Sequence, residues 1–202
     1  MTLMAVTKTY GRGDVLAAYE AGIRVFGENR VLEAAGKYME MPADIELHLI
    51  GHLQTNKAKT AAEVFRWVDS IDSRHTAAAL DRRLEAAGKS ADILLELNTS
   101  GESSKSGYPD MDTLLKDLPG ILSLPRLRFR GLLTIGPLSG GREAARASFR
   151  TLKTCFDRLR TLPGCEAVDV LSMGMSSDFE IAVEEGSTMV RLGTALFGER
   201  PA

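Results

Sequence analysis

The first residue whose chemistry stands out is Lys8, which follows a short apolar run at residues 3–7. If that run is a buried strand, Lys8 lies at its carboxyl end, where the chain leaves the core. A half-buried lysine is costly as a cation, so it either loses its charge or bonds covalently to a ligand. The second behaviour is what a carbonyl cofactor requires of its Schiff-base lysine. The alternative is that Lys8 extends from the strand end into water and binds nothing.

A second group of residues, near the end of the chain, has the chemistry of an anion site. Ser172, Ser176 and Thr194 carry hydroxyls, and Gly174 and Gly193 can expose backbone N–H groups to an anion. In barrels a phosphate commonly lies between the loops that follow the seventh and eighth strands. The alternative interpretation is a pair of turns that are simply rich in glycine and serine.

Arg191 lies two residues before Gly193 and therefore on the same face of a regular strand. From there the guanidinium could reach an aromatic ring whose phosphate lies farther out. The alternative is that Arg191 forms a structural ion pair.

The elements that must position these residues can be predicted from the apolar pattern. Runs rich in apolar and β-branched residues predict strands at 3–7, 23–26, 45–50, 67–71, 93–97, 127–133, 167–171 and 188–192. Several are almost entirely apolar, which is typical of parallel strands covered on both faces. Amphipathic spacing predicts helices at 14–21, 31–39, 56–65, 77–87, 111–118, 142–162 and 177–185. Pro119 is expected to end the fifth helix, and Ser177 with Glu180 forms a capping-box pattern at the seventh.

Eight strands that alternate with seven helices predict an α/β fold with a parallel sheet and right-handed crossovers. Eight such units in 202 residues favour one domain over residues 1–202, closed as a (β/α)8 TIM barrel. The alternative, an open doubly wound sheet, normally carries a glycine-rich dinucleotide fingerprint after the first strand. The Gly-Arg-Gly sequence at 11–13 lacks the third glycine. In a barrel, Lys8, Ser172 and Thr194 all belong to the functional face at the carboxyl ends of the strands.

The composition limits the binding partners and the cellular compartment that can be expected. A formal net charge of −2, from 25 basic and 27 acidic residues, argues against nucleic acid or an anionic membrane as the main partner. Cys155 and Cys165 form no metal-ligand pattern and no disulfide framework, which favours a reducing cytoplasm. No segment is long and apolar enough to span a membrane, and no signal peptide precedes the first strand. His48 and His52 lie too far apart on an extended strand to share a metal ion, so no metal is expected.

Five motifs carry a resemblance to a known family. They are AVTKT at 5–9, FGENRV at 26–31, HLIGHLQTNK at 48–57, LSMGMSSDFE at 171–180 and EGSTMVRLGTALFG at 185–198. Taken together and in order, they resemble the pyridoxal phosphate homeostasis proteins, whose fold is similar to the N-terminal barrel of alanine racemase. The resemblance implies a protein that binds pyridoxal 5′-phosphate (PLP) and takes part in vitamin B6 homeostasis.

The resemblance also implies roles for individual residues. Lys8 would form the Schiff base, and Arg191 would face the pyridine nitrogen. Ser172, Gly193 and Thr194 would contact the phosphate, and Asn29, Met173 and Ser176 would line the cofactor pocket. Because arginine does not give up a proton, the pyridine would stay unprotonated and would be a poorer electron sink.

Two features distinguish the chain from a working racemase. A racemase draws its second acid/base, a tyrosine, from a following β domain, which this sequence does not contain. Ile135 takes the place of the histidine that the racemase brings beside the ring. The expected function is therefore cofactor holding rather than catalysis, with PLP-dependent apo-enzymes as recipients and a monomeric state.

Three further expectations belong with this interpretation. The family usually has a helix before the first strand, which this sequence lacks, so apolar surface should be exposed beside strands eight and one. A PLP-dependent racemase that uses Lys8 as its sole base remains an alternative. So does a barrel that binds another phosphorylated metabolite without a covalent bond.

Overall fold

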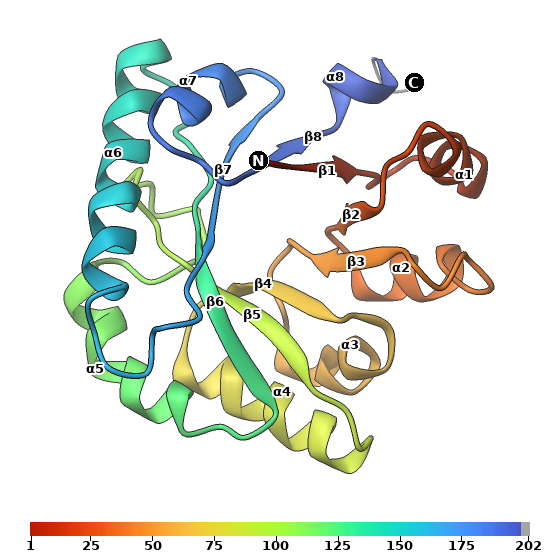
Figure 1. The fold of residues 1–202 in the computed structure, drawn as a ribbon, viewed down its shortest axis with the longest axis horizontal. Coiled ribbons are helices and arrows are strands. Elements are labelled where there is room, and N and C mark those ends of the chain that lie inside the picture. The colour runs from red at the N-terminus through yellow and green to blue at the C-terminus, as the bar shows by residue number, and fades with distance from the viewer. Residues whose placement is uncertain (199–202) are drawn as a thin grey trace.

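The computed structural model describes residues 1–198, which form a closed barrel of eight parallel strands in sequential order (Figure 1). The strands are β1 (Thr2–Val6), β2 (Val25–Glu28), β3 (Glu46–Leu49), β4 (Trp67–Ile71), β5 (Ala91–Glu96), β6 (Leu127–Leu133), β7 (Val170–Met175) and β8 (Met189–Leu192). Strand β8 pairs with both β7 and β1, so the sheet has no free edge. The predicted (β/α)8 barrel is confirmed, and the open doubly wound sheet is excluded.

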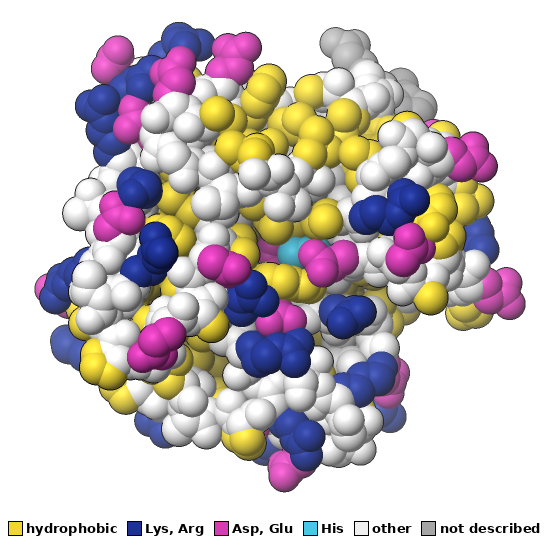
Figure 2. All heavy atoms as spheres, in the orientation of Figure 1, with side chains coloured by type: hydrophobic (Ala, Val, Ile, Leu, Met, Phe, Trp, Pro, Cys, Tyr) yellow, Lys and Arg dark blue, Asp and Glu magenta, His cyan; other side chains and the backbone are white. Residues whose placement is uncertain are grey.

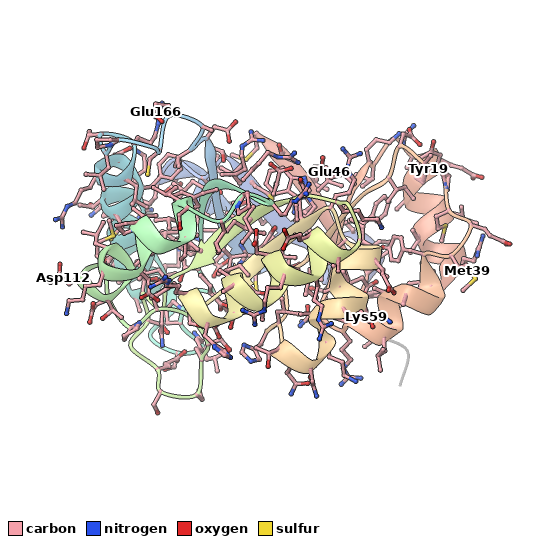
Figure 3. The ribbon with its side chains drawn as sticks, turned by 90° about the horizontal axis from the view of Figure 1, so that it is seen from below. Tyr19, Met39, Glu46, Lys59, Asp112 and Glu166 are labelled. Carbon is pink, nitrogen blue, oxygen red and sulfur yellow. The ribbon has the colours of Figure 1, made fainter. Side chains whose placement is uncertain are left out.

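Helices alternate with the strands and cover the outside of the barrel. They are α1 (Arg12–Glu20), α2 (Val31–Lys37), the 3-10 turn η1 (Thr55–Lys57), α3 (Ala58–Val64), α4 (Arg74–Ala86), α5 (Met111–Leu122), α6 (Gly141–Leu159), α7 (Phe179–Glu184) and α8 (Thr194–Phe197). In the view turned by 90°, α3, α4 and α5 lie along the side of the sheet (Figure 3). Within residues 1–198, every helix is too short or too polar to cross a membrane.

The apolar residues form two cores on opposite faces of the sheet. The larger core lies between strands and helices and includes Val68 and Leu132. A smaller cluster is made by Trp67, Leu94 and Leu133, whose chain neighbours belong to the larger core. Because side chains alternate along a strand, the smaller cluster faces the barrel interior.

Strand β2 begins at Val25, two residues later than the apolar pattern predicts. The N–H of Ile23 still bonds to the carbonyl of Ala18 and completes the end of α1. As a result Glu28 is the last residue of the strand and is fully buried, rather than part of the following loop.

Strand β7 also begins late, at Val170 instead of residue 167. The preceding apolar residues, Cys165 and Val168, are buried in turns, and the N–H of Val168 bonds to the carbonyl of Cys165. The strand also ends later than predicted, so residues 172–175 are part of it and not of the loop after it. This shift changes where the predicted site residues point.

Several predicted helix ends differ from the structure, and the differences at α5 and α7 have a clear physical reason. Pro119 does not end α5, which continues to Leu122. A proline removes only one backbone donor, and the N–H of Ser123 still bonds to the carbonyl of Pro119. The N-cap of α7 is Asp178 rather than Ser177, and its carboxylate accepts a bond from the N–H of Met175, 2.6 Å away.

Within residues 1–198, the outer layer next to β8 is formed by the four-residue α8. Met1 and Leu196, at 70% and 41% exposure, leave apolar surface there, as expected. Figure 2 shows hydrophobic side chains gathered on this part of the molecule.

Candidate functional site

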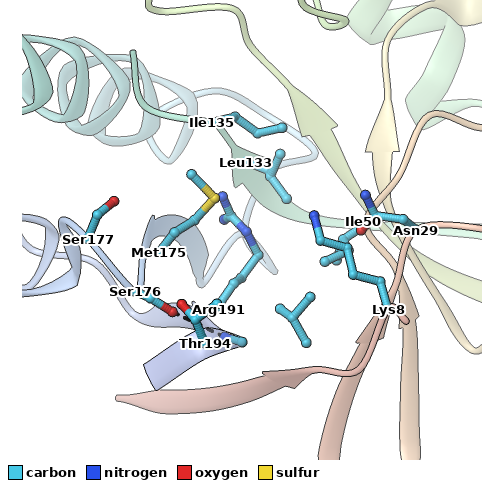
Figure 4. Close-up of a pocket in the computed structure, with 12 residues that line it drawn as sticks. Lys8, Asn29, Ile50, Leu133, Ile135, Met175, Ser176, Ser177, Arg191 and Thr194 are labelled. Carbon is cyan, nitrogen blue, oxygen red and sulfur yellow. Dashed lines mark hydrogen bonds between the residues drawn. The ribbon is translucent and has the colours of Figure 1, made fainter. Parts of the chain in front are cut away.

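A cavity of about 390 Å³ opens at the carboxyl ends of the strands (Figure 4). Its wall is contributed by strands and loops from both ends of the chain, which the barrel closure brings together. The lining residues are Val6, Lys8, Asn29, Ile50, Leu133, Ile135, Met175, Ser176, Ser177, Arg191, Gly193 and Thr194. One part of this wall is apolar, and the remainder carries an amine, a guanidinium, an amide and hydroxyls.

Lys8 lies just after β1, and its side chain extends into the cavity (Figure 4). Val6, the last residue of β1 and two positions before Lys8, lines the same cavity. The chain then turns sharply, because Thr9 has a positive φ of 72°. Such a conformation is strained for a residue with a side chain, so the surrounding contacts must hold this turn.

Those contacts form a buried cluster behind Lys8, on the opposite face of β1. Lys37 of α2 donates from Nζ to the carbonyl oxygen of Thr7 at 2.7 Å and to the carboxylate of Glu28 at 2.8 Å. The hydroxyl of Thr7 also donates to Glu28, at 2.7 Å. Glu33 of α2 accepts from the N–H of Thr9 at 3.1 Å and from Lys37 at 3.0 Å. The backbone is thus held on both sides of Lys8.

The charge state of this cluster follows from its burial. Burial raises the pKa of the Glu28 carboxyl, while the bonds from Lys37 and Thr7 oppose this shift. One oxygen of Glu28, Oε2, is buried without a hydrogen-bond partner among the described residues. Burial likewise raises the pKa of Tyr38, whose hydroxyl lies 2.7 Å from that of Thr7.

Asn29 lies beside Lys8 because the loops after β2 and β3 approach closely (Figure 4). A Cβ atom on Gly51 would lie 2.2 Å from the carbonyl oxygen of Asn29. Only glycine therefore permits this approach, which accounts for the glycine that follows the third apolar run.

Arg191 is buried, and its guanidinium is held from two directions. Nη1 donates to the hydroxyl of Ser172 at 2.8 Å, and Nη2 donates to the carbonyl oxygen of Thr134 at 2.7 Å. Burial lowers the pKa of Arg191, and the carboxylates of Asp69 and Glu96 oppose this effect. A guanidinium has only donors, so it offers the cavity a fixed positive charge and no proton acceptor.

Three of the residues that the sequence predicts for an anion site, Ser176, Gly193 and Thr194, lie at the start of α8 and in the loop after β7. The hydroxyl of Ser176 accepts bonds from the N–H groups of Gly193 and Ala195, at 3.3 and 3.2 Å. Ser177 and Thr194 bring two more hydroxyls to the same wall. Three hydroxyl residues thus lie on one side of the cavity, away from Lys8 (Figure 4).

The structure brings most of the predicted site residues together. Six of them line the cavity: Lys8, Asn29, Ser176, Arg191, Gly193 and Thr194. Ser172 and Met173 are not in its lining, because β7 continues to Met175 and includes both residues. Ser172 instead contacts Arg191, and Met173 points into the core between strands and helices.

Sequence reasoning missed the cluster behind Lys8 and the apolar lining residues Ile50, Leu133 and Met175. A signal for the cluster existed, since Glu28 follows an apolar run and Lys37 follows an apolar helical stripe. Glu96 was also missed. It is buried at the end of β5, where burial raises its pKa to about 7 and Arg191 opposes the shift.

The two histidines considered from the sequence, and a second lysine near the cavity, have other surroundings. His48 is buried between the carboxylates of Asp69 and Glu46, whereas His52 is exposed and lies 3.0 Å from a carboxylate oxygen of Asp72. Among residues 1–198, no group of three or more side chains is arranged to hold a metal ion. Lys105 lies outside the cavity lining, and its amine donates to the carbonyl oxygen of Gly136 at 2.6 Å.

The chain is similar in sequence to known proteins along nearly its whole length. The family model of the alanine racemase N-terminal domain matches residues 1–201. The pyridoxal phosphate homeostasis protein of Pseudomonas aeruginosa is 42% identical, over 98% of this chain and 84% of the relative. The corresponding protein of Synechocystis is 40% identical, over 98% and 91%.

Solved structures give the same result. The structure of PipY from Synechococcus elongatus with PLP bound has a TM-score of 0.89 and 39% sequence identity, and the match covers 98% of this chain and 92% of that one. An alanine racemase of Clostridium difficile shares the fold alone, with a TM-score of 0.79 and 14% identity over 100% of this chain and 52% of that one.

Proposed function

The chain belongs to the family of pyridoxal phosphate homeostasis proteins, and on that premise we propose that it binds pyridoxal 5′-phosphate in the cavity at Lys8. The single observation that supports this most directly is one cavity lined by Lys8, Arg191 and the start of α8. We further propose that the protein holds the cofactor and supplies it to PLP-dependent apo-enzymes, as a cytoplasmic monomer.

The residues present suit this cofactor. When bound, PLP supplies an aldehyde that condenses with a primary amine and a phosphate that accepts hydrogen bonds. The cavity offers an amine at Lys8 and hydroxyls at Ser176, Ser177 and Thr194 on the other side. Its volume of about 390 Å³ lies in the range of small-molecule sites.

Each lining residue then has a defined task. Lys8 would provide the amine that bonds to the aldehyde, and the hydroxyls of Ser176 and Thr194 would hold the phosphate. Arg191 faces the ring as a donor that cannot accept a proton. Ser172 holds Arg191 in place, which revises the phosphate contact expected from the sequence.

A racemase is less well supported. Among the described lining residues, Lys8 is the only side chain suited to exchange a proton with a carbon atom, and racemisation needs an acid/base on each face. Exchange of the α-hydrogen of alanine for deuterium, in the presence of PLP, would favour the racemase instead.

Borohydride trapping tests the assignment of Lys8. We expect PLP followed by borohydride to label the peptide that contains Lys8, as read by mass spectrometry. Lys8→Ala should abolish the label, whereas Lys105→Ala should retain it, because Lys105 bonds to Gly136 outside the cavity. An equally labelled Lys8→Ala protein would contradict the proposal.

A further inference from the structure

A second cavity, of about 540 Å³, adjoins the first and has no role in the function proposed above. It lies between the loops that follow β2 and β3, and we call it the outer cavity. Its lining residues are Asn29, Arg30, Val31, Leu32, Glu33, His52, Gln54 and Lys57. Because Asn29 lines both cavities, the two are neighbours that share a wall. We propose that the outer cavity binds a second phosphorylated pyridine, a deduction that rests on the proposed function.

Two cations of the outer cavity are available to an anion. The side chains of Arg30 and Lys57 form no hydrogen bond or ion pair among residues 1–198, although Arg30 is near enough to help lower the pKa of the Glu33 carboxyl. Arginine and lysine are the side chains that bind phosphate groups best, through charge-assisted hydrogen bonds. A dianionic phosphate therefore matches the charge that this wall presents.

The other ionisable groups of the wall are already engaged. Glu33 accepts bonds from Lys37 at 3.0 Å and from the N–H of Thr9 at 3.1 Å. His52 lies 3.0 Å from a carboxylate oxygen of Asp72, which is outside the lining. The charge left for a ligand is therefore positive, which disfavours a cation or a free amine.

The remaining lining suits a ring. Val31 and Leu32 form an apolar side, and Leu32 is 60% exposed, so a ligand that covers it gains burial of apolar area. The amides of Asn29 and Gln54 supply donors and acceptors of the kind that orient a polar ring.

Size and position favour a small molecule over a peptide. The outer cavity is larger than the 390 Å³ cavity to which we assign one PLP, so a ligand of the same class fits. A phosphorylated pyridine bound there would be held in the cavity next to Lys8 while the first cavity is occupied. The outer cavity thus raises the local concentration of the ligand that Lys8 takes up.

The experiment uses protein whose first cavity is permanently filled. PLP is fixed on the protein with borohydride, and the label on Lys8 is counted by mass spectrometry. Pyridoxine 5′-phosphate, which has an alcohol in place of the aldehyde, is then titrated by equilibrium dialysis. We expect one further equivalent to bind and inorganic phosphate to displace it.

Matched variants locate the binding. Arg30→Gln and Lys57→Gln should each weaken binding of pyridoxine 5′-phosphate roughly tenfold, the effect of one lost charge-assisted bond. Lys59→Gln serves as the control, since Lys59 is exposed on α3 outside the lining and is labelled in Figure 3. The proposal is overturned if the reduced wild-type protein binds no further equivalent, or if all three variants bind equally well.

The same experiment gives a different result if the protein does not bind PLP at Lys8. In that case no label forms on Lys8, and the titration is run on the unreduced protein. A selective loss of binding in Arg30→Gln and Lys57→Gln, against Lys59→Gln, would still support the outer cavity. Equal binding in the three variants would overturn it there too.

Discussion

Two hydroxyl residues predicted to hold the same phosphate have different surroundings. Ser172 is buried and accepts a bond from Arg191, whereas Thr194 is exposed on the cavity wall. A hydroxyl that satisfies a buried donor and a hydroxyl that faces a ligand should respond differently to removal.

We therefore expect Ser172→Ala to lower the free energy of unfolding of the PLP-free protein by about 1–3 kcal/mol, since it leaves a buried guanidinium donor unsatisfied. Thr194→Ala should change that free energy by less than about 0.5 kcal/mol. It should instead weaken PLP retention by about 0.5–1.5 kcal/mol. Urea unfolding and equilibrium dialysis measure the two effects, and similar unfolding curves for both variants would contradict the distinction.

His48 makes stability depend on pH. Burial alone would lower the pKa of its imidazole, but the carboxylates of Asp69 and Glu46 raise it from 6.5 to about 9. A base whose pKa is raised by folding makes its full contribution to stability when the pH is below its pKa in the unfolded chain. That contribution is lost as the pH rises through the pKa of the same group in the folded protein.

The free energy of unfolding should accordingly fall by about 3 kcal/mol between pH 6.5 and 9 on account of His48. Urea unfolding at several pH values measures this slope. His48→Gln should flatten it, while His75→Gln, at an exposed position on α4, should leave it unchanged. A slope that persists in His48→Gln would assign it to other groups.

At the scale of elements, α2 and β2 together determine where Lys8 stands. Lys37 and Glu33 of α2 and Glu28 of β2 hold the backbone at Thr7 and Thr9. The strands of a barrel determine where the functional face lies. The direction of a side chain just after a strand depends on contacts with the helical layer, such as those made by α2.

Lys37→Met should destabilise the protein by about 3–5 kcal/mol, because it leaves the Glu28 carboxylate buried without its cation. Adding Glu28→Gln should recover part of that loss, since the charge is then removed with its partner. Urea unfolding compares these variants with Lys116→Met, at an exposed position on α5. A double variant no more stable than Lys37→Met would argue against a coupled pair.

At the scale of the whole molecule, the site joins the two ends of the chain. Lys8 follows β1, while Arg191 and Thr194 belong to β8 and α8, and β1 pairs with β8 to close the barrel. A ligand that bridges these elements stabilises the closed barrel as a unit, because it binds the folded state alone.

PLP at about 100 times its Kd should add roughly 2.7 kcal/mol of stability. For a domain of this size, that corresponds to a rise in Tm of about 5–10 °C. Differential scanning calorimetry with and without PLP measures the shift. Lys8→Ala should lose most of it and Lys105→Ala none, and an unchanged Tm in the wild-type protein would count against binding at the closure.

The sequence by itself determined the architecture and the main chemical groups. Apolar runs alternating with amphipathic segments are a local property, and they correctly predicted a closed parallel barrel with Lys8 and Arg191 at one face. The type of each element depends on residues a few positions apart, so periodicity suffices to predict it.

Only the tertiary structure decided the register of the strands and the residues that each site residue contacts. Strand β7 continues to Met175 rather than ending at residue 171, and within it Met173 faces the core between strands and helices while Ser172 contacts Arg191. The cluster behind Lys8 and the outer cavity likewise depend on loops that are distant in the sequence. A one-residue change in strand register exchanges the two faces of a strand, and that register is decided by packing between segments far apart in the chain.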